Sequence, residues 1–599
     1  MGNLTNSQKS IWVTEQYYKG SSVNNICGYA IIEEQVDLDK LKKAIQIVCQ
    51  KHDNFWLQLK IEDGEVKQFL SERKEIEIET INVSTPEELQ EKVQQIVKIP
   101  FKLEESELFK FYIYKFENGQ GGYMPKIHHL ISDGWTMALI GNEIIEIYSQ
   151  LKQNQETDLM PIYSYIDYMK SEQEYLESDR YQKDKKYWEE RFLQIPEVAT
   201  IPGSKTNGDE SNPKGNRKKY KLEPKKLEKI KIYCKENKIS LYNFFMAIYA
   251  IYIGEISNLD EFVIGTPILN RTNFKEKNTM GMFINMVPFK INMNQNDDFK
   301  AFVKSIATES MGMLKHQKYS YQSLLENLRE KNANIPNLYN ILLSYQITNT
   351  HQNGGDMIYK NEWAFNGCCA ENMDIQISDF NDTGNLDISY DYKISIYEEK
   401  DIENLHKRIL NIIEQVIAKE EIKLKDIEIV TTEEKEKLVK EFNRTELEYD
   451  SNIPIIKFFE EQVIKTPNNI AIVFENKKMT YKELNEKANS LAHELRKNGV
   501  TNNTIVGIMQ ERSFEMMIAI LAVLKSGGGY IPIAPDYPAE RIQYMLEDSN
   551  TSILLAETNK VKTDKTIISI NLNNKIYEEN KENIENISKP EDLSYLIYT

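Results

Sequence analysis

The chain has 599 residues, more than one hydrophobic core usually supports, so several domains are expected. Its formal net charge of -18 repels phosphate backbones and anionic lipid, and we therefore expect neither nucleic acid nor a membrane surface as a partner. The five cysteines are scattered without a CxxC pair and the amino terminus lacks an apolar secretion segment, which favours a cytoplasmic protein without disulfides.

The first informative elements lie between residues 108 and 151. Residues 108–116 (LFKFYIYKF) alternate apolar and polar side chains, and ENGQGG supplies turn residues before the short run YMPKI. This pattern predicts a hairpin that delivers His128 to a strand end. Apolar residues then recur at helical spacing from Trp135 to Leu151, and Ser132 or Asp133 can cap that helix.

The segment HHLISDG (128–134) is therefore predicted to be a strand-to-helix loop, where rigid elements hold side chains at a surface or cleft. Neighbouring residues at a strand end point in opposite directions, so we expect one of His128 and His129 to face a cleft and the other to pack inward. Asp133 can fold back onto backbone or onto a cation. Gly134 permits a close approach of the backbone or a positive φ.

An imidazole in such a loop suits a general base acting on an amine or hydroxyl nucleophile. No serine or cysteine at nucleophile-elbow spacing accompanies it, which favours direct transfer over a covalent acyl-enzyme. The plain alternative is a coincidental histidine pair. A zinc site is disfavoured because the sequence lacks both the spaced histidines of HExxH and a cysteine cluster. We expect no metal and no cofactor bound by the chain itself.

The remaining patterns divide the chain. Residues 241–256 (LYNFFMAIYAIYIGEI) are too short to span a bilayer and predict a buried helix. Residues 432–452 form a charged helix followed by a linker-like passage. Beyond them, alternating helices and strands predict an α/β domain with parallel strands. Its SGGGY segment comes after a helix and before a strand, an order that indicates a helix stop rather than a phosphate loop.

HHLISDG resembles the HHxxxDG core motif of the condensation domains of nonribosomal peptide synthetases, and companion stretches follow in that family's order over residues 1–430. They are LTNSQKSIW (Leu4–Trp12), KHDNFW (Lys51–Trp56), YSYIDYMK (Tyr163–Lys170), GMFINMVPF (Gly281–Phe289) and HQKYSYQSL (His316–Leu324). Further along, MTYKEL (Met479–Leu484) and LKSGGGYIPIAPDYP (Leu524–Pro538) resemble the first two core motifs of adenylation domains, and LSYLIYT resembles the lead-in to the third.

The resemblance implies an α/β fold with two chloramphenicol-acetyltransferase-like lobes in a V shape, about 1–171 and 172–431. A linker at 432–452 and a partial α/β adenylate-forming domain at 453–599, truncated before its phosphate-binding loop, would follow. The implied reaction is peptide (amide) bond formation between a donor acyl or aminoacyl thioester and an acceptor aminoacyl thioester. Phosphopantetheine arms of donor and acceptor carrier proteins would present both substrates.

Site residues are carried over position by position. His129 matches the catalytic histidine, Gly134 would help to hold the oxyanion, and His128 and Asp133 match positions that are mainly structural. The family's second motif normally ends in an arginine that pairs with the motif aspartate, whereas this chain has Trp56. The partner of Asp133 is then Arg271, loop amides or solvent.

Several alternatives stay open at this stage. Because Met1 directly precedes the first motif, we expect the donor to arrive from another protein or as a free thioester. Because the second resemblance stops at Thr599, we expect no amino-acid adenylation by these residues. Starter and L-accepting condensation subtypes both fit the motifs. An acyl-CoA-dependent small-molecule acyltransferase and a catalytically inactive carrier-docking scaffold are the competing interpretations.

Overall fold

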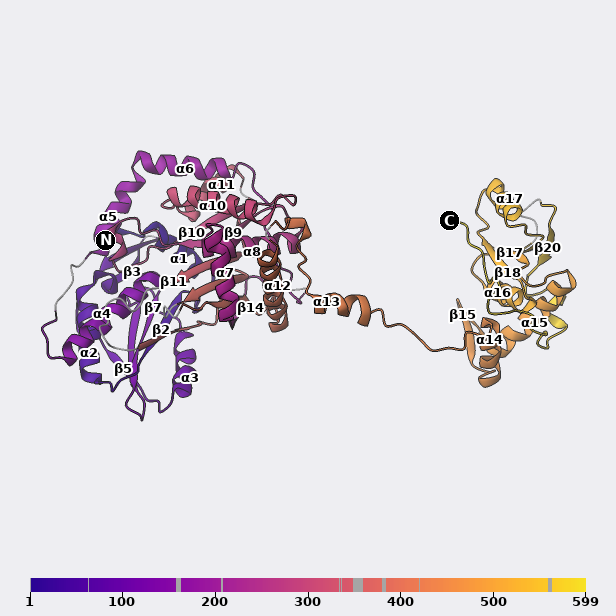
Figure 1. The fold of residues 1–599 in the computed structure, drawn as a ribbon, viewed down its shortest axis with the longest axis horizontal. Coiled ribbons are helices and arrows are strands. Elements are labelled where there is room, and N and C mark those ends of the chain that lie inside the picture. Colours follow the sequence, from indigo (N-terminus) through magenta and orange to yellow (C-terminus); the bar gives the residue numbers. More distant parts are fainter. Residues whose placement is uncertain are drawn as a thin grey trace. The chain divides into compact units, whose positions relative to one another are not determined.

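The computed structural model describes residues 2–62, 64–157, 163–205, 208–332, 334–335, 337–347, 359–379, 384–419, 421–557 and 563–599. These residues form two compact units, Met1–Glu441 and Phe442–Thr599, and Figure 1 follows the chain through each of them. The division falls inside the segment 432–452, for which the sequence predicts a linker.

The first lobe of the first unit is built on a five-stranded mixed sheet with the order β12-β2-β7-β6-β5. Helices α2 and α4 cover one face of this sheet, and α3 covers the other. The bounds of these elements are β2 Asn25–Ile32, α2 Leu38–Lys51, β5 Ile78–Ile81, α3 Pro86–Val97, β6 Phe109–Lys115, β7 Gly121–His128 and α4 Gly134–Lys152.

Strands β6 and β7 form the predicted hairpin, with eight-residue β7 ending at His128. The alternation seen in the sequence does not make β6 one-sided, however. Phe111 and Ile113 pack with α2 and α4, while Tyr112 and Tyr114 pack with α3. Because helices cover both faces, the hairpin is packed on each side.

The amino-terminal residues contribute a second small sheet and a helix, α1. Strands β1 (Gly2–Asn3), β4 (Glu65–Leu70) and β3 (Leu57–Glu62) pair in the order β1-β4-β3. Helix α1 (Asn6–Tyr17) begins with a capping box in which Thr5 and Gln8 exchange hydrogen bonds. The buried face of α1 therefore starts in a fixed register.

The second lobe has a six-stranded sheet with the order β10-β9-β11-β13-β14-β8, and helices α7, α8, α10 and α12 contribute to its core. The bounds are β8 Gly215–Lys221, α7 Pro224–Glu236, α8 Leu241–Ser257, β9 Glu261–Ile268, α9 Phe274–Lys277, β10 Asn285–Asn292, α10 Phe299–Lys315, α11 Tyr321–Lys331, β11 Ile341–Ile347, β13 Met373–Asp379, β14 Asp387–Lys393 and α12 Glu399–Ala418.

Helix α8 is buried from Phe244 to Gly254, which confirms the buried helix predicted for this stretch. Among the described residues, no single helix is long and apolar enough to cross a membrane. Helices α7 and α8 meet that test only as a pair, and they are bent by 106° relative to each other.

Helices and a strand connect the lobes. Helices α5 (Tyr165–Leu176) and α6 (Asp179–Arg191) lead from the first lobe into the second along the top of the unit in Figure 1. In addition, β12 (Tyr359–Ala364), which follows β11 in the sequence, pairs antiparallel with β2 of the first lobe. Residues 359–364 therefore belong to the sheet of the first lobe, although they lie in the range 172–431 that the sequence predicts for the second lobe.

The second unit has the predicted order of helices and strands. A hairpin of β15 (Ile470–Phe474) and β16 (Lys477–Thr480) lies between α14 (Ile455–Lys465) and α15 (Tyr481–Lys497). The parallel sheet that follows has the order β18-β17-β19-β20, with bounds β17 Ile505–Met509, α16 Phe514–Ser526, β18 Gly529–Ile533, α17 Ala539–Asp548, β19 Ile553–Ala556 and β20 Thr566–Ser569. Parallel strands are confirmed.

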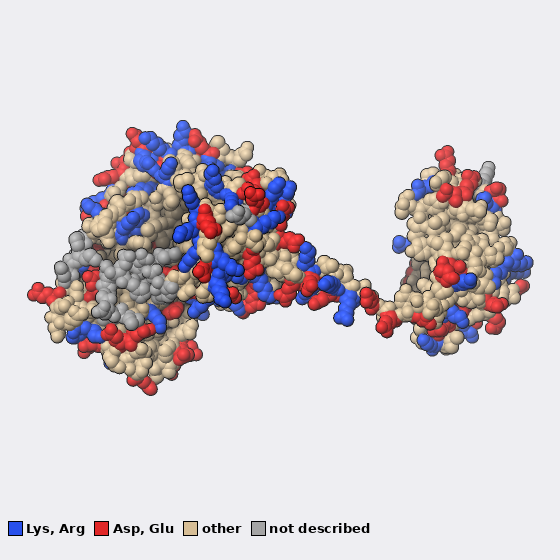
Figure 2. All heavy atoms as spheres, in the orientation of Figure 1, with Lys and Arg blue, Asp and Glu red and all other residues tan. Residues whose placement is uncertain are grey.

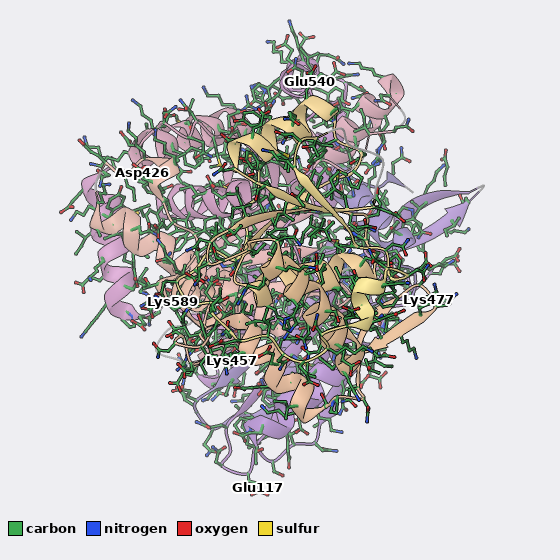
Figure 3. The ribbon with its side chains drawn as sticks, turned by 90° about the vertical axis from the view of Figure 1, so that its right-hand side faces the viewer. Glu117, Asp426, Lys457, Lys477, Glu540 and Lys589 are labelled. Atoms are coloured by element: carbon green, nitrogen blue, oxygen red, sulfur yellow. The ribbon has the colours of Figure 1, made fainter. Side chains whose placement is uncertain are left out.

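Charged side chains of both signs are interspersed over the visible face of each unit (Figure 2). Figure 3 labels examples at the surface, among them Glu117 in the β6–β7 turn and Lys477 of β16, and both are exposed. Because these faces carry no surface field of one sign, buried polar groups are the stronger candidates for a functional site.

Candidate active site

The two histidines and Asp133 lie in the predicted strand-to-helix loop. His128 is the last residue of β7, and Gly134 is the first residue of α4. Asp133 is the N-cap of α4, and its Oδ1 accepts a hydrogen bond of 2.7 Å from the backbone N–H of Thr136. Of the two possible caps, the structure uses Asp133. Ser132 is also fully buried, whereas His129 and Gly134 are partly exposed.

His129 presents a nitrogen suited to a base. Its Nδ1 lies 3.2 Å from the carbonyl oxygen of Ser132, and because a carbonyl only accepts, Nδ1 carries the proton. Nε2 then has a free lone pair, and no described residue hydrogen bonds to it. Burial, reinforced by the neighbouring His128 ring, lowers the pKa of His129 to about 4. The imidazole is therefore neutral near pH 7, the form a base requires.

His128 points the other way, as expected, and is 2% exposed. Its Nδ1 accepts a 3.2 Å hydrogen bond from the N–H of Leu130, so its proton is on Nε2. That nitrogen lies 3.4 Å from Oε2 of Glu15, a buried carboxylate on α1. His128 is thus committed to internal partners and only His129 has a free nitrogen.

Asp133 is fully buried and paired with Arg271, so the solvated alternative is wrong and the proposed substitute for the missing arginine is confirmed. Nη2 of Arg271 lies 3.1 and 3.2 Å from the two carboxylate oxygens and 2.8 Å from Oγ1 of Thr136. The backbone N–H of Phe283 donates to Oδ2 at 3.0 Å, and the Phe283 ring lies 3.8 Å from the guanidinium carbon. A loop amide therefore also contributes.

This pair fastens the two lobes together. Asp133 and Thr136 belong to the start of α4 in the first lobe, whereas Arg271, Gly281 and Phe283 belong to the segment between β9 and β10 in the second. Thr136 Oγ1 donates to the carbonyl of Gly281 at 2.7 Å and accepts from its N–H at 3.0 Å. The loop that carries His129 is consequently held by both lobes at once.

Gly134 differs from its prediction in one respect. Its backbone is helical rather than left-handed, so a positive φ is not the reason for glycine here. A Cβ built at this position would meet no atom within 4 Å. Open space therefore adjoins the backbone at the start of α4, which agrees with the expected close approach.

Trp56, which stands where the resemblance leads us to expect an arginine, is a core residue. The side chain is 1% exposed, packs in the first-lobe core, and its indole N–H donates to the carbonyl of Cys49 at 2.8 Å. Asp53 of the same motif accepts hydrogen bonds from the N–H groups of Tyr165 and Ile166. The motif is therefore structural, and Arg271 supplies the cation that pairs with Asp133.

Sequence reasoning missed Glu15, Asn24, Thr136 and Phe283. Glu15 follows the opening motif LTNSQKSIW by three residues, so its place on the same helix was the one available signal. The described residues hold no group of three or more His, Cys, Asp or Glu that could bind a metal ion, and all five cysteines are free thiols.

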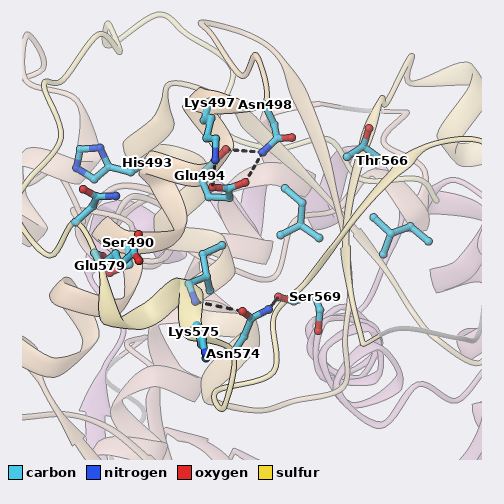
Figure 4. A pocket seen from close by; sticks show the side chains of 14 residues that line it. Ser490, His493, Glu494, Lys497, Asn498, Thr566, Ser569, Asn574, Lys575 and Glu579 are labelled. Carbon is cyan, nitrogen blue, oxygen red and sulfur yellow. Dashed lines mark hydrogen bonds and ion pairs between the residues drawn. The ribbon is translucent and has the colours of Figure 1, made fainter.

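The second unit has a polar pocket of its own, of ≈ 530 Å³, between α15 and β20 (Figure 4). Glu494 binds the side chain of Asn498 at 2.8 Å at its rim. The glycines of SGGGY do not line it. Gly527 instead ends α16 with a φ of 95°, which confirms the helix stop. The absence of adenylation by these 599 residues stays a prediction.

The neutral, free imidazole of His129, held between a hairpin and a helix of a two-lobed α/β fold, suits a protein that transfers an acyl group to an amine or hydroxyl. The family comparison is more specific, since residues 1–439 match the model of the condensation domain and residues 459–599 match that of the AMP-binding enzymes. The first match covers well over half of the chain. The chain therefore belongs to the condensation-domain family of nonribosomal peptide synthetases.

Individual relatives agree with this assignment. One of the plipastatin synthase proteins of Bacillus subtilis (strain 168) is 33% identical over 558 residues, which are 93% of this chain and 22% of that protein. Surfactin synthase subunit 1 of the same organism is 32% identical over 604 residues, 100% of this chain and 17% of that protein. The chain thus spans about a fifth of the length of these relatives.

Solved structures show the same fold at lower identity. A four-domain nonribosomal peptide synthetase bound to AMP and glycine aligns with a TM-score of 0.80 at 18% identity, covering 95% of this chain and 44% of that one. A mutant starter condensation domain of rhizomide synthetase in complex with C8-CoA aligns with a TM-score of 0.65 at 19% identity, covering 71% of this chain and 97% of that one.

Proposed function

We propose that residues 1–439 catalyse amide-bond formation between a donor acyl or aminoacyl thioester and the amine of an acceptor aminoacyl thioester, as a step of nonribosomal peptide biosynthesis. The observation that carries this proposal is the unprotonated Nε2 of His129. It is the one nitrogen of the histidine pair without a partner among the described residues, and its low pKa keeps it neutral.

In the proposed reaction the acceptor amine nitrogen attacks the thioester carbonyl carbon, and a C–N bond forms. His129 Nε2 orients the amine and takes its proton. Collapse of the tetrahedral intermediate breaks the C–S bond, and the proton passes to the leaving thiolate, so the products are an amide and a free thiol. The N–H groups at the start of α4, beside the open space at Gly134, support a role in holding the oxyanion.

The partners of this reaction are two carrier proteins whose phosphopantetheine arms bring the thioesters, with the donor supplied in trans. The chain itself binds no cofactor in this proposal. A cytoplasmic location fits the five free thiols. These statements extend the family assignment, and they are tested together with the activity.

The test uses the full chain with separately purified carrier proteins. Donor carriers are loaded with octanoyl or aminoacyl groups, acceptor carriers are loaded with each standard amino acid, and amide products are detected by mass spectrometry. The expected result is amide formation that requires both loaded carriers and His129. A folded chain that forms no amide with any pair supports the inactive scaffold instead.

A second arm separates the two enzymatic interpretations. The donor carrier is replaced with octanoyl-CoA and the acceptor carrier with free amines or alcohols. Condensation predicts much slower turnover without carriers, because the carrier surfaces bring the thioesters to the site at high effective concentration. Equal or faster turnover with octanoyl-CoA and a free acceptor favours a small-molecule acyltransferase.

A further inference from the structure

Helix α1 contributes a buried acidic group to the histidine pair, and neither the motif nor the family assignment gives it a role. Glu15 is 6% exposed, although an isolated carboxylate is costly to bury. Its Oε2 accepts a 2.8 Å hydrogen bond from Nδ2 of Asn24 and lies 3.4 Å from Nε2 of His128. The two donors compensate the burial, so this oxygen is fixed at a definite place beside the loop.

The contact with Glu15 sets the tautomer of His128. A carboxylate can only accept, so Nε2 of His128 carries the proton and Nδ1 presents its lone pair to the N–H of Leu130 at 3.2 Å. The other tautomer would place two hydrogens against each other at Leu130. Glu15 therefore controls the hydrogen bond that shapes the backbone directly after His129.

Through Asn24, Glu15 also influences the backbone at the N–H of His129. Its side chain donates to Glu15, and its backbone carbonyl accepts a 2.9 Å hydrogen bond from the N–H of His129. A second residue of α1, Gln8, donates to the carbonyl of Leu130 at 2.9 Å. The backbone on both sides of His129 is thus fixed to groups that α1 holds in place.

We propose that Glu15 is a positioning residue for His129: through His128 and Asn24 it fixes the backbone from which the base projects, and so fixes the direction of its free Nε2. Glu15 touches neither substrate in this proposal. The inference rests on the proposed condensation activity, since it concerns the efficiency of the base in that reaction.

The experiment replaces Glu15 in the full chain in three ways. Glu15→Leu keeps the volume and removes both acceptor contacts, Glu15→Ala provides a smaller substitute should the leucine variant be insoluble, and Glu15→Gln keeps an oxygen that can accept both hydrogen bonds. Thermal unfolding checks that each variant is folded. The loaded-carrier assay gives kcat and the KM for the acceptor.

We expect Glu15→Leu, or Glu15→Ala in its place, to lower kcat by about 10- to 100-fold with little change in acceptor KM, because misplacement of a catalytic group acts on the chemical step. Glu15→Gln should restore kcat to within about threefold of the parent, since the hydrogen bonds return. In a His129→Ala background the same Glu15 substitution should cause no further loss, because the two residues act as one unit.

Two results would overturn the inference. One is a folded Glu15→Leu or Glu15→Ala variant with the kcat of the parent. The other is a loss that multiplies with that of His129→Ala, as expected of an independent structural effect. A parent chain that forms no amide at all contradicts the proposed function itself, and the inference falls with it.

Discussion

Two junctions of the molecule contain glycine beside a helix, and they differ in whether they can form an active site. In the first unit, 128–134 leads from strand β7 into the start of α4; in the second unit, 526–529 leads from the end of α16 into β18. The first junction places His129 and Asp133, the latter paired with Arg271, at the N-terminus of a helix. At the second junction a left-handed glycine, Gly527, ends the helix. Chain direction therefore decides which junction becomes a site, because only a helix start offers donors.

The two junctions also differ in what surrounds their buried ion pairs. Asp133 and Arg271 are both shielded from solvent at the first junction, and the pair is anchored in two lobes. Directly before the second junction, Lys525 of α16 pairs with Glu460 of α14 and so joins two helices. Buried ion pairs are thus common to both regions. A neutral base beside one of them distinguishes the first.

The largest expected effect is on catalysis, from His129→Ala. Removal of a positioned general base should lower the rate of amide formation by about two to four orders of magnitude. The loaded-carrier assay measures the rate, and circular dichroism shows whether the variant is folded. His128→Ala is not a neutral control because it disturbs Glu15, so His493→Ala in the second unit serves as the matched variant. If folded His129→Ala formed amide at a near-normal rate, His129 would not be the base. The first junction would then lose the feature that separates it from the second.

The next largest effect is on stability, from Arg271→Met. This change leaves the buried Asp133 carboxylate without its cation, and such a loss costs about 3–5 kcal/mol of unfolding free energy. Urea unfolding of the first unit measures it. Adding Asp133→Asn to the same variant should recover part of the loss, because no unpaired charge then remains. An Arg271→Met variant as stable as the parent would mean that solvent reaches Asp133.

The sequence predicted much of this region, and the limits have physical causes. The β6–β7 hairpin, the cap and α4 follow from local periodicity and turn residues, which act over a few positions. The pairing of β12 with β2 joins residues more than 300 apart, and no local pattern encodes it. Arg271 was a candidate because a buried carboxylate requires a cation. Glu15 could not be found in that way, because His128 alone does not demand a charged partner.

The pH dependence comes third in size. The proposed base must be neutral to take a proton, and the pKa of His129, about 4, lies well below the ordinary value of 6.5 because the ring is buried. As pH falls, the rate should therefore show no bend near 6.5 and a downward bend near 4, where the base takes a proton. For an ordinary histidine, about tenfold would already be lost one unit below 6.5. A profile of kcat against pH on the full chain, with folding checked at each value, distinguishes the two.

The smallest effects test the glycines themselves, with Gly527→Ala and Gly134→Ala as a matched pair. At Gly527 the backbone has a φ of 95° and a Cβ would lie 2.8 Å from the Ile587 side chain, so alanine should cost about 1–2 kcal/mol. At Gly134 the backbone is helical and a Cβ would meet nothing within 4 Å. Alanine there should leave the unfolding free energy within about 0.5 kcal/mol of the parent.

For activity, we expect the same two variants to rank in the opposite order, with the larger loss from Gly134→Ala. Gly527→Ala lies in the second unit and should leave amide formation unchanged. Gly134→Ala fills the space beside the first turn of α4, where the thioester carbonyl is proposed to approach, and should lower kcat/KM without loss of stability. Unfolding curves and the loaded-carrier assay on both variants give the four measurements required. If Gly134→Ala kept full activity, the open space at this helix start would have no part in binding the reacting carbonyl, and His129 alone would set the first junction apart from the second.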